Sequence, residues 1–295
     1  MVSKESALID VLIIGITFGL IYGLVAISYS LIWQSMNLIH FAQGDLLMIG
    51  GFIAITLCNN GISNMFPVLI ITFIALAIIG ALMQNGIYRF IPQKKGVTRI
   101  ISTLGMGIIF KNIAVLVWGS NSHALPETFF PGSAISILGI SIRPVYYWTL
   151  LISVLLVVLL MLFLYKTKFG LAVRLTAYNT ELANLMGVNP VIYQTVAFSL
   201  AIGITGVAGI LCSPISYVSY KMGLAFGVKG FAAAIIGGLD SFPGAIIGGI
   251  IIGLIEVAFG QYLSGYIDAV VFGIMILVLV IRPHGLFGKA KAIKI

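Results

Sequence analysis

The 295-residue chain has little charge of either sign, and its acidic residues are the scarcest, since only eight Asp and Glu stand against sixteen Lys and Arg. Charged residues make up 8% of the chain, whereas an ordinary soluble domain carries about 25%. So few charges cannot cover the surface of a soluble globule. The composition therefore excludes a soluble protein, a disordered protein and a nucleic-acid binder.

Residues that carry enzyme chemistry are equally sparse. The two cysteines, Cys58 and Cys212, lie at the ends of apolar runs and are interpreted as small apolar residues rather than as a disulfide or a metal pair. The three histidines form no HExxH motif, and the sequence contains neither Gly-x-Ser-x-Gly nor a P-loop. We therefore expect no catalytic residue, no metal and no cofactor bound by this chain.

Long apolar runs are what the sequence has in abundance. A bilayer core needs roughly 20 apolar residues in a helix, and six runs meet that length. These runs are Ala7–Ile32, Phe66–Phe90, Ile100–Gly119, Val145–Tyr165, Val191–Cys212 and Tyr266–Ile281. Two more apolar segments are interrupted by polar residues. We predict an all-α polytopic integral membrane protein, one membrane-embedded domain over 1–295, with about eight transmembrane segments. Its helices near 37–57 and 231–260 are expected to be broken or re-entrant.

The positions of the basic residues predict the orientation. Eleven of the sixteen fall in three regions that lie on one side if the intervening helices cross normally: Arg89, Lys94, Lys95, Arg99, Lys166, Lys168, Arg174, Arg282, Lys289, Lys291 and Lys294. Cytoplasmic loops carry the Lys and Arg excess, so this side, with the basic tail 282–295, is expected to be cytoplasmic. Lys4, Arg143, Lys221 and Lys229 are assigned to the other side. The N-terminus is external if 41–57 crosses the membrane and internal if it re-enters.

Ionisable residues inside a membrane span are costly and need a reason. Lys111 can snorkel to the interface, and Asp268 lies near the end of a span. Glu256 is harder to dismiss, and the sequence leaves open whether it forms a structural ion pair or serves transport. The residues at the two breaks are the remaining candidates for a polar pathway: Asn37, His40, Gln43, Gly44, Asp45, Asp240 and Ser241.

Glycines recur four residues apart in two segments: Gly15, Gly19 and Gly23 in the first, and Gly244, Gly248, Gly249 and Gly253 in the second. Small residues at this spacing let helix backbones approach closely. The favoured interpretation is packing within one subunit, and the alternative is a dimer seam. Just before the second series, Asp240 and Ser241 can cap a helix that begins at Pro243. This break is either a transporter-type broken helix or a short loop outside the membrane.

The cytoplasmic loop 166–190 contains a short amphipathic helix. Leu175, Leu182, Leu185 and Met186 fall on one helical face. Asn179 or Thr180 can begin the helix, Gly187 can end it, and Pro190 prevents its continuation. Helices that lie on a membrane surface are usually basic, whereas this one is nearly neutral, so a protein partner is favoured over the membrane surface.

Four stretches carry a family resemblance from residue 10 to residue 288. They are Asn37–Asp45 followed by Met48-Ile-Gly50, Ile101–Gly107 with Asn112, Phe231–Gly249 with Glu256, and Val278–Gly288. Together with the pattern Ala177…Glu181-Leu-Ala…Leu185-Met-Gly187, they resemble the H-type permease subunit of bacterial branched-chain amino acid uptake systems, which are ABC importers. His40 and Gln43 depart from the family pattern, which usually has Asn and His there.

The resemblance implies a multi-pass protein of the bacterial inner membrane that translocates leucine, isoleucine and valine without an ATPase site of its own. It implies a second, M-type permease in a heterodimer, two cytoplasmic ATPase subunits that bind ATP and magnesium, an external solute-binding protein, and no nucleic acid. The residues that couple to the ATPase would be Arg174, Ala177, Glu181, Leu182, Leu185 and Gly187. The alternatives are urea, a short-chain amide or another amino acid as the solute, or an ion-coupled secondary transporter; a membrane-embedded enzyme is the least favoured.

Overall fold

The computed structural model describes residues 4–92, 96–137, 140–178, 180–263 and 265–288. Within these residues, six helices are long and apolar enough to cross a membrane. They are α1 (Lys4–Met36), α3 (Met65–Gly86), α4 (Gly96–Trp118), α5 (Pro144–Lys166), α8 (Pro190–Ser216) and α10 (Phe242–Leu263). Three shorter apolar helices join them: α2 (Gln43–Asn59), α9 (Met222–Gly237) and α11 (Ile267–Ile281). The prediction of an all-α polytopic membrane protein is confirmed.

One expected span was wrong. The run Tyr266–Ile281 forms α11 with almost the expected bounds, but its 15 residues reach only about 22 Å, which is less than the roughly 30 Å of a bilayer core. The interruption expected within 231–260 is confirmed, since α9 ends at Gly237 and α10 begins at Phe242. The segment contains the end of α9, which already begins at Met222, and most of α10, which is itself long enough to span. The turn between them passes through Gly238, at φ +100°.

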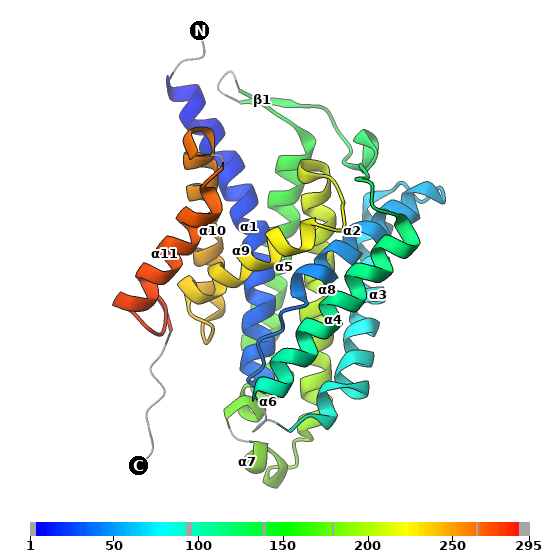
Figure 1. The fold of residues 1–295 in the computed structure, drawn as a ribbon, viewed down its shortest axis with the longest axis vertical. Helices are drawn as coiled ribbons and strands as arrows, with labels where there is room; N and C mark the ends of the chain where they lie inside the picture. Colours follow the sequence, from blue (N-terminus) through cyan, green and yellow to red (C-terminus); the bar gives the residue numbers. More distant parts are fainter. Residues whose placement is uncertain (1–3, 93–95, 138–139, 179, 264, 289–295) are drawn as a thin grey trace.

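The two ends of the molecule are distinct. Figure 1 shows α1 beginning at the top, and α6 (Lys168–Tyr178) and α7 (Thr180–Leu185) at the bottom beside the α3–α4 connection. The segment 37–42 is not helical and carries the chain from the lower end of α1 to α2, which then rises toward the top. The helix near 37–57 is therefore broken rather than re-entrant, and the N-terminal end of α1 lies at the end opposite α7.

The two glycine series face each other along α1 and α10. A Cβ added at Gly19 would lie 2.6 Å from the Cα of Ile250, and one at Gly253 would lie 2.2 Å from the backbone nitrogen of Gly19. Gly249 meets Gly23 in the same way. Any side chain would force these backbones apart, so the glycine faces are occupied within one chain. We refer to this contact as the α1–α10 seam.

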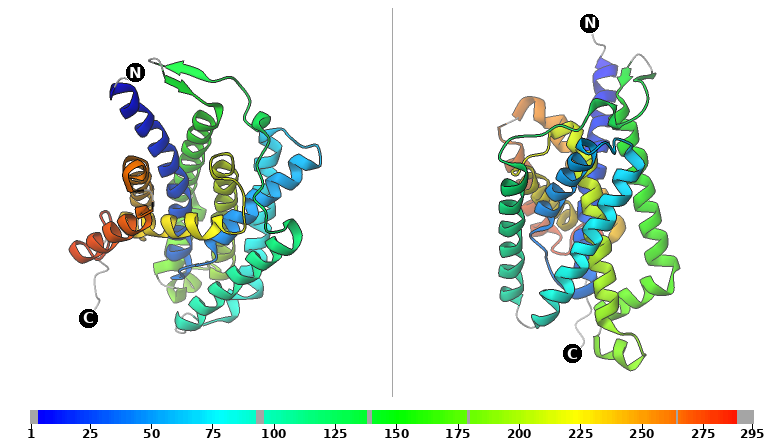
Figure 2. Two further views of the ribbon diagram at one scale, coloured as in Figure 1. Left: turned by 45° about the horizontal axis from the view of Figure 1, so that its top comes forward. Right: turned by 90° about the vertical axis from the view of Figure 1, so that its right-hand side faces the viewer.

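The helix α9 runs strongly tilted across α1 and α2 (Figure 2). Its glycines contact the start of α2, where a Cβ added at Gly44 would fall 2.0 Å from the carbonyl oxygen of Gly223. The helix α4 lies at the edge of the bundle, and the most apolar stretch of α4 is 17% buried against 67% for α1. The helix α4 is therefore largely exposed, and a cavity remains between it and α9.

The connections at the upper end are partly paired, and the longest of them joins α4 to α5 through residues 119–143. Strands β1 (Ile135–Ile137) and β2 (Ile140–Ile142) form an antiparallel hairpin in which Ile135 pairs with Ile142. His123 and Val218 exchange two backbone hydrogen bonds of 2.8 Å and join the chain after α4 to the chain after α8. Short 3-10 turns at η1 (Tyr88–Phe90) and η2 (Glu127–Phe129) complete the described elements.

Candidate functional site

A buried polar network surrounds the segment between α1 and α2. His40 is fully buried, and its Nδ1 lies 3.2 Å from Gln43 Oε1 while its Nε2 lies 2.9 Å from the Tyr88 hydroxyl. Gln43 Nε2 in turn donates to Thr205 Oγ1 on α8. The side chains of His40 and Gln43, which the sequence placed in the pathway, thus bind each other, the 3-10 turn η1 (Tyr88–Phe90) and α8. Their packing positions the broken helix rather than lining an open space.

Gly44 and Asp45 follow that network and do line an open space. A cavity of about 260 Å³ lies between α2, α4 and α9, and its walls include Asp45, Lys111 and Tyr29. The Asp45 side chain lies against the backbone of α4, because a Cβ added at Gly107 would fall 2.5 Å from Asp45 Oδ2. Asp45 and Lys111, which the sequence treated separately, are therefore brought to one cavity.

Glu256 belongs to a different cluster. Lys229 Nζ lies 2.6 Å from Glu256 Oε1 and 3.2 Å from Asp268 Oδ1, and the Tyr22 hydroxyl donates to Glu256 Oε2 at 2.5 Å. The cluster joins α1, α9, α10 and α11. Lys229 was assigned to the non-cytoplasmic side, but it lies buried within α9, because α9 begins nine residues earlier than expected from the apolar pattern. Of the two roles left open for Glu256, the structure supplies the partners for a structural ion pair.

Asn37, Asp240 and Ser241 lie away from both clusters. Asp240 accepts a hydrogen bond of 3.1 Å from the Trp33 indole near the end of α1, and its side chain is exposed. Ser241 Oγ accepts from the backbone N–H of Gly244 at 3.1 Å and so caps the start of α10. Asn37 is exposed at φ +50°. These three residues form turns at the lower end of the bundle, and the structure does not bring them to the cavity with Asp45.

The loop 166–190 forms α6 and α7 rather than one short helix. Asn179, one of the two expected helix starts, and the side chain of Ala177 lie outside the described residues. Gly187 has φ +76° and donates to the Asn184 carbonyl at 3.0 Å, which ends α7. Leu182 and Leu185 are exposed, by 44% and 84% of their surface. Arg174 is half-buried, and its guanidinium lies 5.0 Å from the ring centre of Tyr165.

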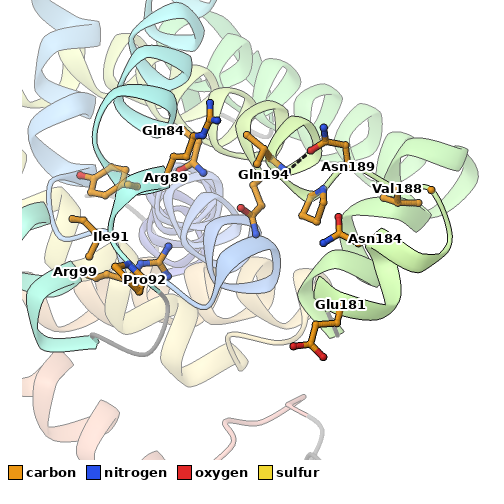
Figure 3. A pocket seen from close by; sticks show the side chains of 14 residues that line it. Gln84, Arg89, Ile91, Pro92, Arg99, Glu181, Asn184, Val188, Asn189 and Gln194 are labelled. Carbon is orange, nitrogen blue, oxygen red and sulfur yellow. Dashed lines mark hydrogen bonds between the residues drawn. The ribbon is translucent and has the colours of Figure 1, made fainter.

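A second cavity, of about 700 Å³, opens at this end. It lies between α7, the start of α8 and the α3–α4 connection, and Figure 3 shows Glu181 and Asn184 on one side of it with Arg89 and Arg99 on the other. The Arg99 guanidinium donates to the carbonyl of Met36 at 2.8 Å and so ties the end of α1 to α4. The cavity lies between the predicted coupling helix and the rest of the membrane domain.

Sequence reasoning missed the partners that come from distant helices. Tyr88, Thr205 and Tyr22 are neither charged nor part of a motif, so no signal singled them out. Lys111 had one available signal: Leu104, Gly107, Ile108 and Lys111 follow a spacing of i, i+3, i+4 and i+7, which places them on one face of α4.

The fold and these polar groups define a class of protein. A multi-pass helical membrane protein in which a broken helix brings polar groups to a cavity has the architecture of a membrane transporter. The family model described as the permease component of branched-chain amino acid transport systems matches residues 11–280, and the chain belongs to this family.

Individual relatives agree with the family over nearly their whole length. The chain is 32% identical to the high-affinity branched-chain amino acid transport system permease protein BraD of Pseudomonas aeruginosa, over 96% of this chain and 97% of that protein. It is 30% identical to the permease protein LivH of Escherichia coli K12, over 95% and 96% of the two chains. A probable LivH permease of Methanocaldococcus jannaschii is 29% identical over 90% and 88%. No solved structure matches the chain.

Proposed function

We propose that this chain is the membrane-spanning permease subunit of an ABC importer that carries branched-chain amino acids into the cell. The observation that carries the proposal is the family match over residues 11–280, together with near-complete coverage of relatives named for this transport. The chain moves the solute and hydrolyses no ATP itself, since its sequence contains no P-loop.

The proposed location is the inner membrane, with α6, α7 and the C-terminal tail in the cytoplasm. The basic residues support this orientation, because Arg89, Arg99, Lys166, Lys168 and Arg174 all belong to the end of the molecule that carries α7. The start of α1 lies at the opposite end of the molecule, which supports an external N-terminus in this orientation. The C-terminal residues 289–295, with three of the eleven basic residues, lie outside the described residues.

Two ATPase subunits, carrying ATP and magnesium, would dock on the cytoplasmic end. The exposed apolar side chains of Leu182, Leu185 and Met186 on and beside α7 suit a protein surface, because isolated apolar groups of this size gain by burial in an interface. A related M-type permease would complete the membrane core, and an external binding protein would deliver the solute.

The first test is reconstitution of the complex in proteoliposomes with its binding protein and radiolabelled leucine, isoleucine or valine. Uptake that requires ATP on the ATPase side supports the proposal. Uptake by this chain alone, driven by a sodium or proton gradient, would instead establish the ion-coupled alternative. Urea or a short-chain amide as the transported solute would keep the importer class and change the solute.

The second test concerns coupling. We expect Gly187→Ala to abolish the stimulation of ATPase activity by the loaded binding protein, because the left-handed conformation at φ +76° costs a side chain about 1–2 kcal/mol and the end of α7 would shift. Gly86→Ala is the matched control at the same end of the molecule, since an added Cβ there meets nothing within 4 Å. Normal stimulation in Gly187→Ala, with the complex intact by size-exclusion chromatography, would contradict the coupling assignment.

A further inference from the structure

The cavity between α2, α4 and α9 is walled by continuous helix faces. On α4 the face is Leu104, Gly107, Ile108 and Lys111, and on α9 it is Gly223, Leu224, Gly227, Val228 and Phe231. The glycines add no side chains to the lining, while the leucine, isoleucine, valine and phenylalanine side chains make most of the lining apolar. A space of about 260 Å³ with apolar walls and few polar groups has the composition of a small-molecule site.

The two charged residues at this cavity, Asp45 and Lys111, lie near enough to attract each other but form no direct ion pair within 4 Å. Among the described residues, ion pairs within 4 Å are formed by Lys229 with Glu256 and Asp268, and neither Asp45 nor Lys111 takes part in one. The Lys111 ammonium lies over the ring of Tyr220, 5.7 Å from its centre. Charges held in a membrane domain without a direct ion pair are costly, and they mark sites where a ligand or ion supplies the partner.

The position of Asp45 supports a ligand site further. Asp45 lies in the first turn of α2, which begins inside the bundle after the non-helical segment 37–42. Broken helices that begin at membrane depth are the elements on which transporters hold polar solutes. The carboxylate lies against Gly107, and both residues line the cavity, so no side chain at position 107 stands between the carboxylate and α4.

We propose that this cavity holds the solute during passage, with the Asp45 carboxylate binding the α-ammonium group and the Lys111 ammonium binding the α-carboxylate. The apolar faces of α4 and α9 then receive the branched side chain. The inference rests on the proposed function, and it names the residues that recognise the zwitterion. The opposite charges of Asp45 and Lys111 cancel, which matches a zwitterion and disfavours a net anion or cation, and a single carboxylate is a poor ligand set for a divalent metal ion.

The test uses the complete importer in proteoliposomes, with its loaded binding protein and radiolabelled leucine. We expect Asp45→Asn and Lys111→Met each to lower leucine uptake at least about tenfold, because each leaves one charge of the solute unpaired inside the membrane domain. Both variants should retain ATPase stimulation by the loaded binding protein, because docking and coupling occur at the two ends of the molecule. A defect in assembly would instead remove both activities.

Matched controls remove charges of the same type elsewhere. Asp10→Asn on α1 and Lys221→Gln on the exposed surface lie outside the cavity and should keep uptake within about twofold of wild type. If Asp45→Asn fails to assemble, Lys111→Met still decides the matter, because the Lys111 side chain is exposed and methionine keeps an apolar side chain of similar length beside the Tyr220 ring.

The outcomes separate this inference from the function on which it rests. Wild-type leucine uptake together with near-normal uptake in both cavity variants would overturn the assignment of Asp45 and Lys111 and leave the importer function standing. A wild-type complex that moves no α-amino acid would overturn the function and the inference together.

Discussion

The α1–α10 seam and the α4–α9 cavity are built from the same kinds of residue and have opposite properties. Glycines line both. At the seam, Gly19 and Gly253 bring two backbones together and leave no room for a methyl group. At the cavity, Gly223 and Gly227 of α9 pack as closely against Gly44 of α2, but α4 does not close over them, and a space of about 260 Å³ remains between the three helices.

The charged residues beside the seam and those at the cavity also differ, because only the former are paired. Next to the seam, Lys229 is neutralised by Glu256 at 2.6 Å and by Asp268 at 3.2 Å, while at the cavity Asp45 and Lys111 lie without such a pair among the described residues. The difference teaches that a membrane-embedded charge indicates a solute site only once its partners are known. A paired charge stabilises the bundle, and an unpaired one is available to a ligand.

The largest effect on stability is expected from Lys229→Met. The substitution leaves Glu256 largely buried without its cation, and breaking a buried pair in this way costs about 3–5 kcal/mol. Thermal unfolding of the purified complex in detergent should show a strongly lowered midpoint. The double variant Lys229→Met/Glu256→Leu should recover most of that loss, since it removes both charges. If Lys229→Met were as stable as wild type, the Lys229 ion pairs would not stabilise the bundle, and the contrast with Asp45 and Lys111 would fail.

An intermediate effect is expected at the seam. Gly19→Ala places a methyl group 2.6 Å from the Cα of Ile250, and overpacking of this kind costs about 1–3 kcal/mol. Gly105→Ala on α4 is the matched substitution, because a Cβ there meets nothing within 4 Å, and it should stabilise by up to about 1 kcal/mol by replacing glycine within a helix. Unfolding midpoints that shift in the same direction for both variants would argue against the contrast.

The smallest effect on stability is expected from Lys111→Met. Its side chain is exposed and takes part in no ion pair among the described residues. The free energy of unfolding should therefore change by no more than about 0.5 kcal/mol, with little shift in the unfolding midpoint. A marked loss of stability in this variant would show that Lys111 belongs to the structural charges, as Lys229 does.

Much of the fold followed from local pattern. Five of the six expected runs correspond to long membrane-spanning helices, because a span is specified by a continuous apolar stretch. The end of α7 at Gly187 followed from a glycine that adopts φ +76°. There are two exceptions. The helix α9 starts within the mixed sequence Met222–Gly230, where three glycines and Lys229 interrupt the apolar pattern. The helix α11 matches its apolar run, but the run is too short to span.

The candidate site was predicted only in part. Asp45, His40 and Gln43 were singled out as one polar group, yet His40 and Gln43 turn toward Tyr88 and Thr205 while Asp45 turns toward α4. The sequence also grouped Asp240, Ser241 and Glu256 with them, although these residues lie in a turn and in an ion-pair cluster. Residues adjacent in the chain can face different helices, and no spacing rule reveals which helix that is.

By itself the sequence determined that the protein lives in a membrane, how long its spans are, which end is rich in basic residues and where backbones can approach closely. These properties depend on single residues or on short periods along one helix. Only the tertiary structure decided that Lys229 neutralises Glu256 and that Asp45 shares a cavity with Lys111. The reason is physical: each pairing joins helices far apart in the chain, and packing in three dimensions sets which charges meet and which remain open to a solute.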